Sequence, residues 1–210
     1  MVFLEMNSDD FRHLLEKKSD VELLQPCLHD EGPPYVFETK PQAWDTFRDE
    51  LVNRLGVVRA EIRIVGSGRF GFSMKPGHNL RAFRDTSDID VVIVNPELFD
   101  QLWLSMLEAA YPRPPATSVI GFGGWLQTRR NELYTGWLTP LEIRLDIRIF
   151  GSKAKPVLDF NARWFDALKQ ASQHPPRRHE DITGRLYRTW RHAELYHLNS
   201  LAVLRKTLAE

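Results

Sequence analysis

The chain has a single cysteine, Cys27, among its 210 residues, so it cannot form an internal disulfide. A lone cysteine fits a reducing compartment, and here it is interpreted as a small packed side chain rather than a nucleophile. No cysteine or histidine cluster has the spacing of a zinc site. Long apolar runs are absent, and so is a basic N-terminal segment followed by one. We therefore expect a cytoplasmic protein without a membrane span.

The sequence also lacks an excess of either charge, because 28 Lys and Arg residues balance 28 Asp and Glu residues. Proteins that bind nucleic acids or membrane surfaces constitutively usually carry net positive charge, so the balance argues against those classes. A local basic patch remains compatible with it. The length is sufficient for one well-buried domain.

The most informative segment runs from residue 61 to residue 94. An apolar strand enters a glycine-rich turn at Gly66 to Gly71, and two carboxylates, Asp88 and Asp90, lead into a second apolar strand. Side chains alternate along a strand, so these carboxylates point the same way, about 6 to 7 Å apart. They repel each other unless a cation lies between them, and Mg²⁺ (or Mn²⁺) is the usual ion that shares such oxygen ligands with substrate phosphates. Two solvated turn carboxylates are the alternative interpretation.

The glycine turn also matches the dinucleotide-binding fingerprint Gly-x-Gly-x-x-Gly, with an acid at about the distance of the ribose ligand. That fingerprint should open a helix, yet Pro76 and Gly77 follow where the helix should continue. Its acid ends a strand, whereas Asp88 and Asp90 begin one. A dinucleotide-dependent oxidoreductase is therefore kept only as a minor alternative.

A third carboxylate lies on the clearest strand pattern of the chain, Leu141 to Ile149, where apolar and polar residues alternate without a break. The polar face consists of Glu142, Arg144, Asp146 and Arg148. This face is often a solvated sheet surface with cross-strand ion pairs. If the strand lies beside Asp88–Val94, Asp146 completes a carboxylate triad, and Arg144 or Arg148 comes within reach of a phosphate or an acid.

The chain has, in this order, a glycine turn, the strand-borne pair Asp88 and Asp90, and a later strand with Asp146. This arrangement resembles the DNA polymerase β-type nucleotidyltransferase superfamily over about residues 58 to 150, close to half the chain. The resemblance implies that Gly66 and Ser67 hold the nucleotide triphosphate. It implies that Asp88 and Asp90 bind both metal ions. It also implies that Asp146 binds the catalytic metal and helps to activate an acceptor hydroxyl.

The segment between Ser67 and Asp88 is longer than in the small members of that superfamily, and the added residues could form a hairpin or flap over the nucleotide. Arg69 and Lys75 within it are candidate phosphate contacts, and a solvated basic loop is the alternative. Near the C-terminus, Arg185, Arg188 and Arg191 recur every three residues, which places them on nearly one face of an expected helix. That face is usually solvated; otherwise it contacts a phosphate or the acceptor.

The expected fold is α+β, with a nucleotidyltransferase-like mixed β-sheet flanked by helices and followed by a C-terminal helical segment. Residues 1–56 should form N-terminal helices and an extended arm over 25–41, residues 57–150 the catalytic core, and residues 151–210 the helical segment, all in one compact unit. Helices are expected over 9–18, 41–55 (capped by Thr39), 95–110, 126–137, 156–171 and 181–208, and a strand over 57–65. His197, on the apolar stripe of the last helix, is interpreted as a satisfied interior histidine.

The sequence thus predicts a metal-dependent nucleotidyltransferase that transfers a nucleoside monophosphate from an NTP such as ATP and releases pyrophosphate. The acceptor hydroxyl is left open among an RNA end, a protein side chain, a second nucleotide and an antibiotic. A small stand-alone transferase with a helical tail also resembles those of bacterial toxin–antitoxin and anti-phage modules, which implies a partner protein from the same operon. A catalytically silent binding or regulatory module with the same fold is the main alternative.

Overall fold

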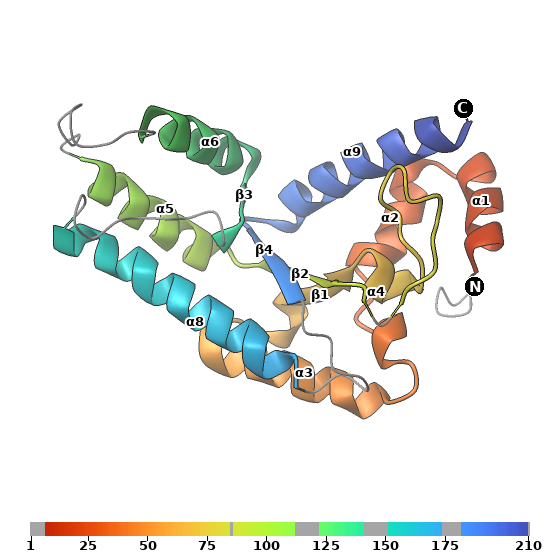
Figure 1. Cartoon of the computed structure of the whole chain (residues 1–210), viewed down its shortest axis with the longest axis horizontal. Coiled ribbons are helices and arrows are strands. Elements are labelled where there is room, and N and C mark those ends of the chain that lie inside the picture. The colour runs from red at the N-terminus through yellow and green to blue at the C-terminus, as the bar shows by residue number, and fades with distance from the viewer. Residues whose placement is uncertain (1–6, 85, 112–121, 141–150, 174–181, 210) are drawn as a thin grey trace.

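A computed structural model of the chain describes residues 7–84, 86–111, 122–140, 151–173 and 182–209 (Figure 1). These residues contain eight helices and one four-stranded mixed sheet, so the expected α+β class is confirmed. The strand order is β1-β2-β4-β3. The strands span Ile62–Val65 (β1), Ile89–Val94 (β2), Trp137–Leu138 (β3) and Ile182–Tyr187 (β4).

Strand β2 lies inside the sheet, with β1 antiparallel on one side and β4 parallel on the other. In this register Asp90 is opposite Val65 of β1 and Thr183 of β4. The short β3 pairs antiparallel with the far side of β4. The strand expected over Leu141–Ile149 lies outside the described residues.

Alternation along the strands gives the sheet two differently covered faces. Ile89, Val91 and Ile93 of β2 face a core formed with α3 (Pro41–Leu55), α5 (Pro96–Ala110) and α8 (Lys155–Ala171). Val92 and Val94 face a second core formed with α1 (Ser8–Lys17), α2 (Asp20–Leu28) and α9 (Trp190–Ala209). The sheet is therefore the middle layer between two groups of helices (Figure 1).

Local sequence signals explain the helices that were expected. Asn7 caps α1 by accepting hydrogen bonds from two backbone amides of the first turn. Asn95 accepts from the amide of Leu98 at 2.7 Å and begins α5. Helix α3 has Pro41 in its first turn and ends at Gly56, whose φ of 71° suits glycine. Thr39 is not its cap, because the N-cap position belongs to Lys40 and carries no side-chain hydrogen bond.

The N-terminal arm is shorter than expected, because residues 25–28 belong to α2, which Ser19 begins with a reciprocal hydrogen-bond pair to Glu22. A 3₁₀ turn over Tyr35–Phe37 interrupts the remainder. Strand β1 also starts later than expected, since Arg59–Glu61 form another 3₁₀ turn before it. Helix α6 spans Phe122–Thr135 and ends ahead of Trp137, which belongs to β3.

The largest correction concerns the helix expected over 181–208. Residues 182–187 form the inner strand β4, and only Trp190–Ala209 are helical. Gly184 allows Trp164 of α8 to lie directly on β4, because a Cβ at this glycine would stand 2.8 Å from the indole ring. The C-terminal segment therefore contributes to the sheet as well as to its cover. None of the helices in the described ranges has the length and apolar character needed to cross a membrane.

Candidate functional site: a carboxylate pair beside a glycine turn

The glycine turn begins directly after β1, and its first residue has a backbone conformation that favours glycine. Gly66 has φ 63° and ψ −143°, and the following helix α4 (Ser67–Phe70) ends after one turn at Gly71, whose φ is 81°. The strands before and after this turn, β1 and β2, are antiparallel. A dinucleotide-binding unit joins parallel strands through a full helix, so these residues do not form one.

Asp90 lies directly against this turn. It is the second residue of β2 and pairs across the ladder with Val65, the last residue of β1. A Cβ built on Gly66 would stand 3.4 Å from Asp90 Oδ2. Asp88 comes immediately before β2 and is exposed, while Asp90 is half-buried. The structure thus brings the predicted carboxylate pair and the glycine turn together.

Thr183 on β4 holds the other oxygen of Asp90. Its hydroxyl donates a hydrogen bond to Asp90 Oδ1 at 2.6 Å. The sequence analysis missed Thr183 because it placed residues 181–208 in a helix. The alternation of Ile182, Gly184 and Leu186 with more polar residues is a strand signal that could have found it.

The pair is electrostatically unfavourable when both acids are ionised. Burial raises the pKa of Asp90, the hydrogen bond from Thr183 opposes that shift, and the charge of Asp88 adds to it. The positive charges of Arg185 and Lys75 lower the same pKa. The two carboxylates therefore concentrate negative charge at the start of β2. Arg185 of β4 and Lys75, which precedes β2, offset part of it.

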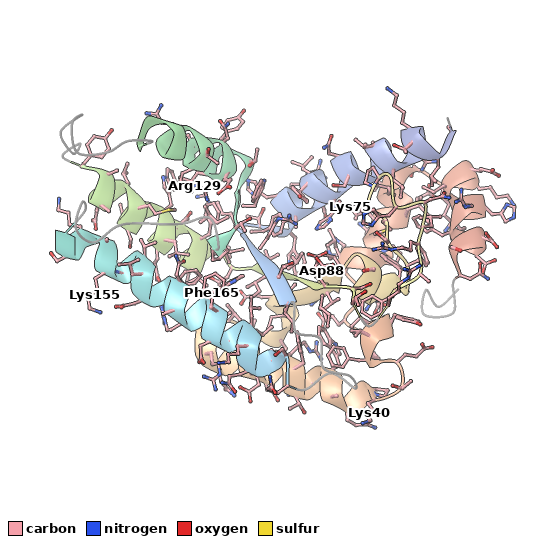
Figure 2. All side chains as sticks on the ribbon, in the orientation of Figure 1. Lys40, Lys75, Asp88, Arg129, Lys155 and Phe165 are labelled. Atoms are coloured by element: carbon pink, nitrogen blue, oxygen red, sulfur yellow. The ribbon has the colours of Figure 1, made fainter. Side chains whose placement is uncertain are left out.

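Lys75 comes from a hairpin that connects α4 to β2. The amide of Ser73 donates to the carbonyl of Arg81 at 2.8 Å, and the amide of Phe83 donates to the carbonyl of Gly71 at 2.7 Å. Lys75 itself is exposed, and Figure 2 shows its position on this hairpin together with Asp88. It stays a candidate phosphate contact.

Arg69 has a different place from the one expected. Its side chain is only 4% exposed, Nη1 donates to the carbonyl of Gly32 at 2.8 Å, and Nη2 forms an ion pair with Asp30. The guanidinium is therefore engaged within the fold, neither solvated nor directed at the carboxylate pair. A phosphate contact at Arg69 stays a prediction.

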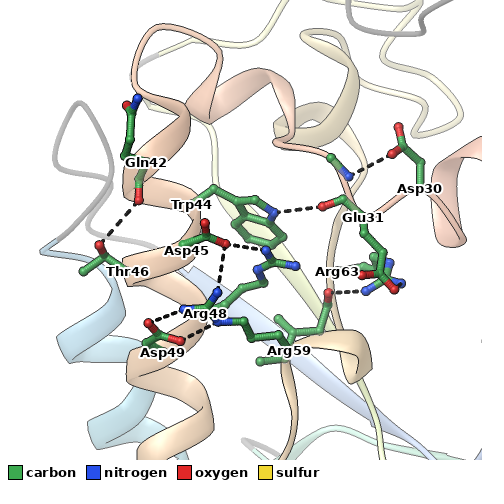
Figure 3. A network of polar contacts seen from close by, with 12 residues as sticks. Asp30, Glu31, Gln42, Trp44, Asp45, Thr46, Arg48, Asp49, Arg59 and Arg63 are labelled. Atoms are coloured by element: carbon green, nitrogen blue, oxygen red, sulfur yellow. Dashed lines mark hydrogen bonds and ion pairs between the residues drawn. The ribbon is translucent and has the colours of Figure 1, made fainter.

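The loop that holds Arg69 is itself fastened to the core (Figure 3). The Glu31 carboxylate accepts from the buried Arg63 of β1 at 3.2 Å, and the Glu31 carbonyl accepts from the indole of Trp44 in α3 at 3.2 Å. Arg63 also donates to the carbonyl of Leu28 at 3.0 Å. These contacts anchor the loop that accepts the Arg69 guanidinium.

The three C-terminal arginines do not share a helix face. Arg188 follows β4 and pairs with Asp100 at 3.0 Å, and Arg191 of α9 pairs with Glu194 at 3.0 Å. Arg185 lies on β4, two residues after Thr183 and on the same face of the sheet. Of the three, only Arg185 belongs to the surroundings of Asp90.

Asp146, Arg144 and Arg148 lie outside the described residues, so their places in the site stay predictions. Within the described ranges, no three Asp, Glu, His or Cys side chains are grouped closely enough to hold a metal ion. The described part of the candidate site therefore supplies two carboxylates, Asp88 and Asp90.

No family model, curated protein or solved structure matches this chain. The resemblance to the nucleotidyltransferase superfamily therefore rests on the motifs of the sequence.

Proposed function

We propose that this protein is a metal-dependent nucleotidyltransferase, which transfers a nucleoside monophosphate from an NTP to an acceptor hydroxyl and releases pyrophosphate. One observation carries the proposal: the carboxylate of Asp90 is held by Thr183 at 2.6 Å and lies against the Gly66 turn, with Asp88 beside it. A strand-borne acid pair at a glycine turn is the arrangement that the superfamily uses for nucleotide transfer.

The residues present fit divalent metal ions. Asp90 is half-buried with a raised pKa and a like charge nearby, so a cation would stabilise its ionised form. Asp88 and Asp90 would hold the ions, with Asp146 as the third ligand that the resemblance suggests. Bound Mg²⁺ or Mn²⁺ supplies charge neutralisation to phosphate oxygens and favours deprotonation of the acceptor hydroxyl.

The chain's own residues then bind and orient the donor. Gly66 has no side chain, so phosphate oxygens can approach the backbone beside Asp90, where the hydroxyl of Ser67 is available as a further donor. Lys75 from the hairpin offers positive charge to the phosphates, and the same charge lowers the pKa of Asp90. Thr183 keeps one oxygen of Asp90 in a fixed direction.

The test is transfer of label from each α-labelled NTP, in the presence of Mg²⁺ or Mn²⁺, to total RNA or cell extract. Transfer should disappear in folded Asp88→Asn/Asp90→Asn protein. The matched control is Asp159→Asn/Asp166→Asn, which removes the same charge from exposed positions of α8. Digestion of the labelled product with ribonuclease or protease then identifies an RNA or protein acceptor.

Undiminished transfer by Asp88→Asn/Asp90→Asn protein would refute the proposal. Tight NTP binding without transfer to any acceptor, including candidate proteins from the same operon, would instead identify a binding module that has kept the site and lost turnover.

A further inference from the structure

The hairpin between α4 and β2 carries positive charge without a compensating acid. Residues 71–84 contain Lys75, Arg81 and Arg84 and no Asp or Glu, in a chain whose formal net charge is zero. All three cationic side chains are exposed. Within the described ranges none of them forms an ion pair, whereas the exposed Arg59 pairs with an acid of α3. Their charge is therefore available to a ligand.

The hairpin has a fixed shape, because one of its faces packs on α1. Phe72 and Leu80 are buried, and the rings of Phe72 and Phe11 lie 5.2 Å apart. At the tip, Asn79 and Leu80 have φ values of 48° and 53°, and Asn79 Oδ1 accepts a hydrogen bond from Arg12 Nη2 at 2.5 Å. A leucine at positive φ costs free energy, so the surrounding contacts impose this backbone. The cationic side chains therefore project from a preformed support.

The opposite face of the hairpin combines charge with an exposed aromatic ring. Phe72 points towards α1, so alternation along the two paired segments directs Gly71, Arg81 and Phe83 to the other side. Tyr35 lies on that side, because a Cβ on Gly71 would stand 2.9 Å from its ring, and the ring meets Phe83 edge-on at 6.1 Å. Tyr35 is 39% exposed. Exposed aromatic rings beside unpaired cations suit single-stranded nucleic acids, which stack bases on the rings and place phosphates at the cations.

This surface is continuous with the carboxylate pair. The amide of Phe83 donates to the carbonyl of Gly71 at 2.7 Å, and Gly71 ends the one-turn helix that begins at Ser67. Lys75 of the same hairpin carries a charge that lowers the pKa of Asp90. A polymer bound along the hairpin would therefore have a route to the candidate site.

We propose that the hairpin over residues 71–84, together with Tyr35, binds single-stranded nucleic acid. Arg81 and Arg84 contact phosphates of its backbone, and the ring of Tyr35 stacks on a base. The binding depends only on these side chains; the role of the bound strand as the acceptor, whose terminal hydroxyl receives the nucleotide, rests on the proposed function. RNA and DNA share the chemistry of phosphate and base, and the 2′-hydroxyl group distinguishes them.

The experiment is fluorescence anisotropy of a short labelled single-stranded RNA, and of DNA of the same sequence, titrated with protein in EDTA without NTP. Wild-type protein should bind, and the tighter of the two ligands identifies the kind of strand. Arg81→Gln/Arg84→Gln should lower the slope of log affinity against log salt by about 1.4, at about 0.7 for each phosphate contact. Between about 50 and 200 mM salt, wild-type protein should therefore lose about sevenfold more affinity than the variant.

The matched control is Arg130→Gln/Arg163→Gln, which removes the same charge from exposed positions of α6 and α8 and should keep the wild-type slope. Tyr35→Leu keeps an apolar side chain against Gly71 and removes the stacking ring. Its affinity should fall about tenfold at an unchanged slope. A lowered slope in Tyr35→Leu protein would show that the ring only supports the hairpin, and would overturn its role in stacking.

The proposal fails if neither strand binds, if Arg81→Gln/Arg84→Gln keeps the wild-type slope, or if phosphatidylserine vesicles bind more tightly than either strand, which would identify a membrane surface. Asp88→Asn/Asp90→Asn protein should bind the strand at least as tightly as wild type, so the two proposals can fail separately. Strand binding without label transfer would refute only the proposed function. Label transfer to a protein without strand binding would refute only the inference drawn from the hairpin.

Discussion

Acidification should destabilise this protein through His197. Burial, followed by the charge of Arg185, lowers the pKa of His197 from an ordinary 6.5 to about 4. The unfolded chain therefore binds a proton at His197 between these values while the folded chain does not, so stability falls as the pH falls from 6.5 towards 4. Between pH 6.5 and pH 5 the loss is about 1.5 units at 1.36 kcal/mol each, or roughly 2 kcal/mol.

Urea unfolding between pH 7 and pH 5 measures this loss. The informative comparison is with His197→Phe, which keeps an aromatic ring beside Tyr187 and Tyr196 and cannot titrate. The control is His13→Gln, because His13 is 72% exposed and contributes little to the fold. We expect His197→Phe to lose about 2 kcal/mol less than wild type over this range. Equal losses in the two proteins would show that His197 titrates normally and is not buried as described.

Three further substitutions test the site and its support. Asp88→Asn should stabilise the protein by about 1 kcal/mol, because it removes a like charge roughly 6 to 7 Å from Asp90; a lower urea midpoint would contradict this. Arg69→Met removes a buried guanidinium from the half-buried Asp30 and the Gly32 carbonyl and should cost about 1–3 kcal/mol, against less than about 1 kcal/mol for the half-buried Arg54→Met, both by urea unfolding. Gly71→Ala should cost about 1–3 kcal/mol of calorimetric stability through its φ of 81° and contact with the ring of Tyr35, and wild-type stability would disprove the backbone described there.

Much of the helical part of the fold could be predicted from local signals. Pro41 and Gly56 bound α3, Asn95 begins α5, and the apolar stripe of α8 follows its helical period, because each feature depends on neighbours in the sequence. Strand β4 could not be assigned in the same way. Its partner β2 is about ninety residues earlier in the chain, and the threefold spacing of Arg185, Arg188 and Arg191 imitates a helix face.

The candidate site also has parts that local sequence signals predict and parts that depend on long-range contacts. The glycine turn and the acid pair lie in the same connection between β1 and β2, so the antiparallel pairing of these two strands is enough to bring them together. The roles of Arg69 and Thr183 depended on long-range contacts, with Asp30 and with Asp90 respectively, that no local pattern encodes. Charge made Arg69 a phosphate candidate, and only the structure shows its buried contacts with Asp30 and Gly32.

The inner position of β4 determines when this protein can fold. A nascent chain that has left the ribosome as far as residue 173 contains β1, β2 and β3, but the strand that joins β2 to β3 has not yet been made. Until it arrives, one edge of β2 stays open and could pair with a second chain. The fold and the position of the Asp90 carboxylate, which accepts a hydrogen bond from Thr183, are thus completed only after β4 has been made.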